Sequence, residues 1–323
     1  MTQGLADALR HQGHSVEVVT APFRFLPVRD IVNTIDFWLE QDFNDFSGYR
    51  VDRVIVLQFP AYYAKHDKKV IWLMHQHRAV YDLFNDKDAS PDFRELREKI
   101  HAADTEELSK AGTVFSMSKN VADRLKRYNG IDSIPVYHPP FGEYNFYCEE
   151  PYDYVFYPSR LEALKRQDLL IRAMKHTKTR VKAIIAGDGG QRPRYEKLIE
   201  ELDVGDKVRL IGEVSEEEKY TLYARSLAVF FGPHDEDYGY VALEAMLSSK
   251  AVITCADSGG PLEFIVDGEE GFVVDPLPEL IADKIDSLYH NRRQAKEMGK
   301  MGLEIYRKKN ISWENVVNAL IYS

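Results

Sequence analysis

Cysteine is scarce in this sequence, since only Cys148 and Cys255 occur among 323 residues. They lie far apart and lack the spacing of metal ligands, which argues against a disulfide framework and is typical of a reducing compartment. Basic residues are also fewer than acidic ones, with 42 lysines and arginines against 52 aspartates and glutamates. The net charge of −10 argues against nucleic acid as the main partner, because a phosphate backbone requires a basic face.

Long apolar runs are absent as well. No stretch of about 18 uninterrupted apolar residues occurs, so no segment is predicted to span a membrane. The first residues, MTQGLADALRHQG, lack the basic start and apolar core of a secretory signal. We therefore expect a cytoplasmic protein. A peripheral contact with the inner face of the membrane and the oligomeric state are left open.

The order of the apolar segments predicts an α/β protein with two domains, which its length also favours. Strand-like segments alternate with helical ones at HSVEVVT (14–20), RVIVLQF (53–59), KVIWLMHQH (69–77) and TVFSMS (113–118). The alternation restarts at DYVFYPS and continues to GFVVDP. Such alternation favours parallel sheets covered by helices. We predict Rossmann-like domains at 1–147 and 148–310, a cleft between them, and a helix at 311–323 that returns to the first domain.

The stretch HDEDYGYVALEAM (234–246) is the strongest candidate for a site. It follows the apolar run LAVFF, so it is predicted to turn from a strand into a helix that starts near Gly239. The free N–H groups at a helix start bind anions, and carboxylates accept hydrogen bonds from sugar hydroxyls. Glu236 and Glu244 could flank a ligand that is part diol and part phosphate. The alternative is an ordinary helix start with acidic residues favoured by the dipole.

Basic residues and glycines follow other strands of the same predicted sheet. Arg160 and Lys165 could together neutralise a diphosphate, or they could form a solvated helix start. GDGG (187–190) and DSGGPLEF (257–264) also fall at strand ends, where tight turns are the alternative. Because all of these segments share the carboxyl edge of one sheet, we favour a common site.

Two histidines close a strand of the first domain in MHQHR (74–78). We expect His75 to face the cleft, although a structural histidine is common at a strand end. No third ligand is near in sequence, so no metal site is predicted. Asp104 and Ser118 are expected to have structural roles, Ser118 as a helix N-cap.

Taken together and in this order, the motifs resemble those of the retaining glycosyltransferases of family 4, which have the GT-B fold of two facing Rossmann-like domains. EDYGYVALE matches the Glu-x7-Glu motif of the family, RLEALK its Arg-Leu-x3-Lys motif, GDGG its Gly-Asp-Gly turn and SGGPLEF its later glycine loop. LADALRHQGHSVEVVT also resembles the family's start, which has a further strand and glycine-rich loop ahead of this helix. Either Met1 is not the native start, or the protein is truncated or diverged. Arg166 replaces a frequent glycine and is expected on a helix surface.

The resemblance implies a role for each motif residue. Glu244 would bind the ribose of a nucleotide-sugar, Glu236 would contact the donor sugar, and the segment ending at Val214 would lie near the base. His75, with His77 as the fallback, would lie at the mouth of the cleft. The implied catalytic residues are Glu236 and His75, and the implied donor-binding residues are Arg160, Lys165, Gly187, Gly189, Val214, Gly239, Tyr240, Val241 and Glu244. The family uses no metal and no cofactor besides the donor.

We therefore expect a retaining, metal-independent transferase that moves a hexose from a nucleoside-diphosphate sugar to a glycan or lipid-linked acceptor, as in polysaccharide biosynthesis. A non-catalytic nucleotide-sugar-binding or partner subunit is the alternative from another class. A sugar-nucleotide epimerase of the same fold is a third. The base, the sugar and the acceptor are not readable from the sequence.

Overall fold

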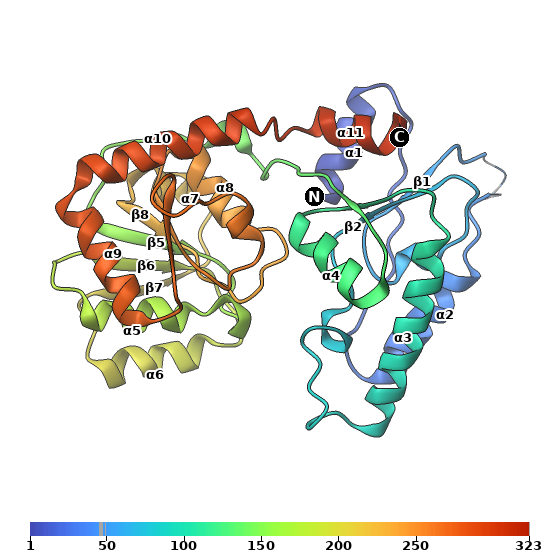
Figure 1. Ribbon diagram of the computed structural model, residues 1–323, viewed down its shortest axis with the longest axis horizontal. Helices are drawn as coiled ribbons and strands as arrows, with labels where there is room; N and C mark the ends of the chain where they lie inside the picture. Colours follow the sequence, from blue (N-terminus) through green and yellow to red (C-terminus); the bar gives the residue numbers. More distant parts are fainter. Residues whose placement is uncertain (45–47, 49, 323) are drawn as a thin grey trace. The chain divides into compact units, whose positions relative to one another are not determined.

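The computed structural model describes residues 1–44, 48 and 50–322 and divides into two compact units (Figure 1). Unit 1 is Met1–His138 together with the segment that starts at Ser312, and unit 2 is Pro139–Ile311. Each contains a parallel sheet with helices, which confirms the predicted α/β class. No helix of the described ranges is both long and apolar enough to cross a membrane.

Unit 1 has a four-stranded parallel sheet in the order β1-β2-β3-β4. Its strands are β1 (Val54–Val56), β2 (Lys69–Leu73), β3 (Val114–Ser116) and β4 (Ile134–Pro135). Its helices are α1 (Thr2–His11), α2 (Val28–Glu40), α3 (Pro91–Ser109), α4 (Lys119–Asn129) and α11 (Trp313–Tyr322), with short 3-10 turns η1 (Ala61–Tyr63) and η2 (Arg78–Val80). The first three strands lie inside predicted segments, and Ser118 caps α4 as predicted by accepting a hydrogen bond from the N–H of Val121.

The strand predicted at HSVEVVT (14–20) is wrong. These residues follow α1 as irregular chain, and none of them pairs with a strand in the part of the chain that the structure describes. Val16 is partly buried against the core cluster, but Val18 and Val19 remain 44% and 47% exposed, so the segment as a whole does not bury one apolar face. A period of two forms a strand only where a neighbouring strand accepts its hydrogen bonds.

Helix α11 belongs to unit 1 although it is far from that unit in sequence. Val316, Val317 and Leu320 are fully buried in one cluster with Leu5 and Leu9 of α1. The guanidinium of Arg53 also donates to the carbonyl of Leu320 at 2.7 Å. The apolar stripe of SWENVVNALIYS thus completes the core of the unit that holds the N-terminal helix.

The chain enters unit 2 at Pro139, ahead of the predicted boundary after residue 147. Residues on both sides of the predicted boundary contact the rest of this unit. The ring of Phe146 lies 4.7 Å from that of Tyr220, and the N–H of Glu149 donates to the carbonyl of Ala224.

Asp104 occupies a fully buried position on α3 among three phenols. Tyr62 and Tyr81 donate to its carboxylate at 2.8 and 2.6 Å, and Tyr63 donates as well. Burial raises the pKa of Asp104 to about 6, although the three hydrogen bonds work in the opposite direction. The cluster ties α3 to η1 and to the chain after η2, which is the structural role expected for Asp104.

We expect the cost of Asp104→Asn in unfolding free energy to depend on pH. A carboxyl whose folded pKa is raised contributes stability that is complete below its unfolded pKa, about 3.9, and is lost as the pH rises through the folded value. The cost should therefore be larger at pH 4.5 than at pH 7.5, by about 2 kcal/mol, in urea unfolding. Asp92→Asn, at an exposed position of the same helix, is the control. Equal costs of Asp104→Asn at both pH values would contradict the assignment.

Unit 2 has a six-stranded parallel sheet in the order β10-β9-β8-β5-β6-β7. Its strands are β5 (Tyr154–Pro158), β6 (Lys182–Ala186), β7 (Val208–Gly212), β8 (Ala228–Phe230), β9 (Val252–Cys255) and β10 (Gly271–Val274). Its helices are α5 (Gln167–His176), α6 (Arg192–Leu202), α7 (Glu216–Arg225), α8 (Tyr240–Leu247), α9 (Pro278–His290) and α10 (Arg292–Lys308). Figure 1 shows α5 and α6 on one side of this sheet, with α7 and α8 on the other.

The order of these strands positions a site. The chain builds β5, β6 and β7 outward in one direction, then returns to place β8, β9 and β10 in the other. Neighbouring β5 and β8 are therefore followed by connections that run to opposite faces of the sheet. In open α/β sheets the crevice outside the carboxyl ends of two such strands is the usual ligand site.

Candidate functional site

Lys165 and Glu236 meet at this switch point. Lys165 ends a short 3-10 turn (Ala163–Lys165) after β5, and Glu236 lies in the connection that follows β8. The ammonium of Lys165 lies 2.5 Å from a carboxylate oxygen of Glu236, and the side chains are 18% and 20% exposed. A cation and an anion thus lie together at the sheet edge where a ligand is expected.

The glycine loops lie beside Glu236. Helix α8 starts at Tyr240, directly after Gly239, which has a left-handed φ of +100°. A Cβ at Gly239 would lie 3.0 Å from the ring of Pro261, so both this close approach and the left-handed φ favour a glycine here. Glu236 donates through its N–H to the carbonyl of Ser258 and accepts from the N–H of Gly260. The stretches around 236 and 259 therefore form one surface.

Glu244 lies one turn into α8 and is 9% exposed. The hydroxyl of Tyr223 donates to one of its carboxylate oxygens at 2.6 Å, and Lys219 contacts the other at 3.4 Å. Burial raises the pKa of Glu244, while Lys219 and Tyr223 act to lower it. Both partners come from α7 and were missed by the sequence analysis. The four-residue spacing of Lys219 and Tyr223 is typical of one helix face, but it does not indicate that this face packs against α8.

Arg160 and the GDGG turn also lie together. Arg160 is exposed, and its guanidinium forms no ion pair with any described residue. Gly187 and Gly189 follow β6 with φ values of +121° and +155°. A Cβ on Gly187 would lie 2.2 Å from the carbonyl oxygen of Ser159, and a Cβ on Gly189 would lie 2.6 Å from that of Leu161. These glycines therefore allow the turn to pack directly on the segment that carries Arg160.

The remaining predicted residues of unit 2 fall on the same edge. Val214 is half-buried between β7 and α7, and Tyr240 and Val241 form the first turn of α8. Burial, followed by the charge of Glu244, raises the pKa of the Tyr240 hydroxyl.

We predicted Arg166 on a helix surface, and this prediction is wrong. Arg166 immediately precedes α5 with a left-handed φ of +51°, and its side chain is only 18% exposed. Its guanidinium donates to both carboxylate oxygens of Asp257, at 2.7 and 2.8 Å. Asp257 lies in the loop after β9. The charged side chain of Arg166 therefore joins the loop after β5 to the loop after β9 beside the candidate site. The sequence had indicated only a replacement of glycine at this position.

The two candidate histidines belong to unit 1, whereas all other predicted site residues belong to unit 2. His75 follows β2, is half-buried, and has its Nδ1 2.7 Å from the carbonyl oxygen of Gln76. His77 is buried between the rings of Phe59 and Phe25, and burial, with the charge of His75, lowers its pKa to about 4. His77 is thus a neutral packing residue at physiological pH.

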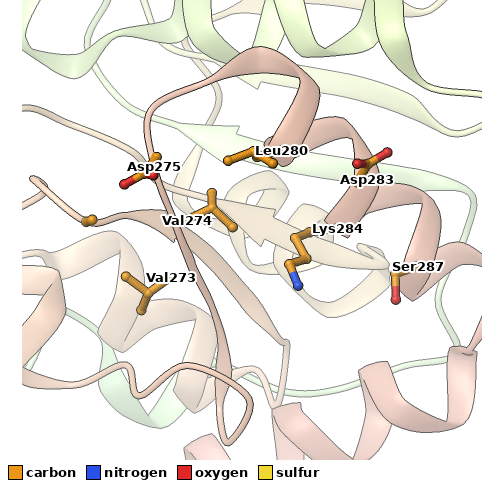
Figure 2. Close-up of a pocket in the computed structure, with 8 residues that line it drawn as sticks. Val273, Val274, Asp275, Leu280, Asp283, Lys284 and Ser287 are labelled. Carbon is orange, nitrogen blue, oxygen red and sulfur yellow. The ribbon is translucent and has the colours of Figure 1, made fainter.

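A surface groove of about 450 Å³ lies between β10 and α9 (Figure 2). Asp275, Asp283 and Lys284 are among its lining residues, and the Lys284 ammonium lies 4.5 Å from the centre of the Phe272 ring. None of the predicted donor-binding residues lines this groove. Within the described ranges, no group of three or more histidine, cysteine or carboxylate side chains is arranged to hold a metal ion.

Comparison with known proteins identifies the family of unit 2. Residues 148–304 match the family described as glycosyl transferases group 1. The chain is 29% identical over 203 residues to an uncharacterised glycosyltransferase of Methanocaldococcus jannaschii, which covers 62% of this chain and 53% of that protein. It is 32% identical over 107 residues to alpha-1,3/1,6-mannosyltransferase ALG2 of Mus musculus, covering 33% and 26%. The chain thus spans from a quarter to about half the length of these relatives.

Solved structures match over almost the whole chain. Sucrose-phosphate synthase from Thermosynechococcus elongatus superposes with a TM-score of 0.79 at 18% identity, over 99% of this chain and 91% of that one. Anabaena HepE, solved in complex with UDP and glucose, gives a TM-score of 0.68 at 17% identity, over 98% and 87%. These likenesses identify the fold as GT-B, in agreement with the two parallel sheets. The match to the glycosyl transferases group 1 family covers residues 148–304, which lie within unit 2.

Proposed function

We propose that this protein is a retaining glycosyltransferase that moves a hexose from a nucleoside-diphosphate sugar to a glycan or lipid-linked acceptor without a metal ion. The ion pair of Lys165 and Glu236 at the switch point of unit 2 carries the proposal. It joins a cation suited to a diphosphate with a carboxylate suited to a sugar, at the sheet edge where α/β proteins bind ligands. The family match and the name of the mannosyltransferase relative support a sugar donor.

The donor would extend along the carboxyl edge of the sheet. Glu244 would accept hydrogen bonds from the ribose diol, and Val214 would lie near the base. Arg160 and Lys165 would neutralise the diphosphate with the amides of Gly239, Tyr240 and Val241, while Gly187 and Gly189 would keep the neighbouring loop close. Charge neutralisation of this kind stabilises a departing diphosphate without a metal.

Glu236 and His75 would serve the donor sugar. The carboxylate of Glu236 would stabilise positive charge that develops on the sugar as the diphosphate departs. His75 is the histidine proposed to contact the sugar from unit 1, because His77 is held between two phenylalanine rings. The acceptor is proposed to bind unit 1.

Calorimetric titration with UDP, GDP, ADP and dTDP tests the donor site. We expect one of the four to bind, and Glu244→Gln to weaken it by about 10- to 100-fold, the usual worth of hydrogen bonds to a charged group. Glu196→Gln, at an exposed position on α6 of the same unit, is the control and should leave affinity unchanged. If no nucleotide binds to the folded wild-type chain, the donor site is wrong.

Turnover separates an enzyme from a binding subunit. The nucleotide-sugar that shares the preferred base should be hydrolysed slowly, or transferred when an acceptor is present, and EDTA should not change the rate. Binding without any turnover at high protein concentration would instead identify a non-catalytic subunit. Release of an epimerised donor would identify an epimerase.

A further inference from the structure

Arg166 ties together three loops at the carboxyl edge of unit 2. Its own loop follows β5 and carries Lys165 at the preceding position. Its guanidinium donates to the carbonyls of Gly232 and Pro233, at 2.9 and 2.7 Å, in the loop after β8. Its two terminal nitrogens also donate hydrogen bonds to the two carboxylate oxygens of Asp257, in the loop after β9. All three loops belong to the candidate site.

The backbone conformation at Arg166 is unfavourable for an arginine, which indicates that the contacts of its side chain are needed to hold this structure. A φ of +51° is the left-handed conformation, which disfavours any residue other than glycine by about 1 kcal/mol or more. The residue nevertheless is an arginine, and its guanidinium makes four hydrogen bonds in a half-buried setting. Burial alone would raise the pKa of Asp257, yet the bonds from Arg166 hold that pKa below its usual value. The pair is therefore ionised, and its fork geometry is one that lysine cannot reproduce.

The bonded loops lead directly to the two charged residues of the site. Pro233 lies three residues before Glu236 in the sequence, and backbone bonds continue the connection from that point. The N–H of His234 donates to the carbonyl of Leu164, and the N–H of Asp235 donates to the carbonyl of Asp257. A shift of the guanidinium would therefore move the backbone on both sides of the contact between Lys165 and Glu236.

We propose that Arg166 is a positioning residue of the donor site, which acts through Asp257 and the loop at 232–236 to hold Lys165 against the diphosphate. This inference rests on the proposed function. Arg166 does not contact the donor in this assignment, and the proposal is that its effect on phosphate binding passes through Lys165.

A double-mutant cycle on nucleotide affinity tests the inference. Arg166→Lys keeps the charge but loses the two-point fork, and we expect it to weaken the preferred nucleoside diphosphate by about tenfold. In a Lys165→Met background the same substitution should change affinity less than twofold, because the residue through which it acts is gone. Asp257→Asn, which leaves the arginine in place, should reproduce the pattern if Arg166→Lys does not fold. Arg194→Lys is the matched control, because Arg194 is an exposed arginine of α6 that also pairs with an aspartate, Asp168 of α5.

The outcomes separate the two proposals. Equal losses from Arg166→Lys in both backgrounds would overturn the positioning role, since a general loss of folded structure acts independently of Lys165. Unchanged affinity in the Arg166→Lys chain would overturn it too. A folded wild-type chain that binds none of the nucleotides would overturn the donor site itself, and the positioning role with it.

Discussion

Glu236→Gln is expected to reduce donor turnover by 10²- to 10³-fold, on the order of the effect of one removed electrostatic contact in an active site, with nucleotide binding nearly unchanged. The proposed charge on the sugar exists only as the diphosphate departs, so the carboxylate stabilises the transition state more than the bound donor. The substitution also leaves Lys165 without the carboxylate that lies 2.5 Å away. The full charge of Lys165 then acts on the diphosphate, so affinity for the nucleoside diphosphate should stay constant or rise.

The two quantities are measured on the same preparation, turnover from released nucleotide and affinity by calorimetry. Glu196→Gln, which removes an exposed carboxylate paired with Arg192, should leave both unchanged. If Glu236→Gln weakens nucleotide binding as strongly as it slows turnover, Glu236 is a binding residue and the catalytic assignment is wrong.

Gly187→Ala is expected to destabilise unit 2 by about 4 kcal/mol, a value reserved for severe backbone and packing defects. A φ of +121° is unfavourable for alanine, and the new Cβ would lie 2.2 Å from the carbonyl oxygen of Ser159. Because that atom is backbone in the loop after β5, no side-chain rotation relieves the overlap. Either the turn or the segment that carries Arg160 must move.

Thermal unfolding provides the measurement, with an expected decrease in the midpoint on the order of 10 °C. Gly190→Ala is the matched control, three residues along the same turn. No described atom outside its chain neighbours lies within 4 Å of a Cβ there, and its φ lies outside the left-handed range. If both substitutions cost the same, the close approach at Gly187 does not limit stability.

The site of unit 2 was largely predictable because its signals are local. An apolar strand, a glycine and a helix-forming run are contiguous in LAVFFGPHDEDYGYVALEAM, and α8 starts after Gly239 as predicted. The order of alternating segments also placed the motif loops on one sheet edge. The functional roles given to these residues remain predictions.

The errors arise where a contact joins segments that are distant in sequence. HSVEVVT has strand-like alternation, but pairing depends on a neighbour that no local pattern specifies. Arg166 was expected on a helix surface, because its partner Asp257 lies 91 residues further along the chain and no local pattern indicates their contact. Tyr223 and Lys219 reach Glu244 only through the packing of α7 beside α8.

Helix α11 makes unit 1 a discontinuous unit, with a consequence for the order of events during protein synthesis. Residues 1–138 leave the ribosome before unit 2, but Leu5 and Leu9 can contact Val316, Val317 and Leu320 only after all of unit 2 has been made. A domain encoded first normally folds first. Here the N-terminal core can be completed only at the end. Trp72, Phe115 and Val136 of the same cluster are made early, but the part that α11 contributes is missing while the intervening 173 residues of unit 2, Pro139–Ile311, emerge and fold.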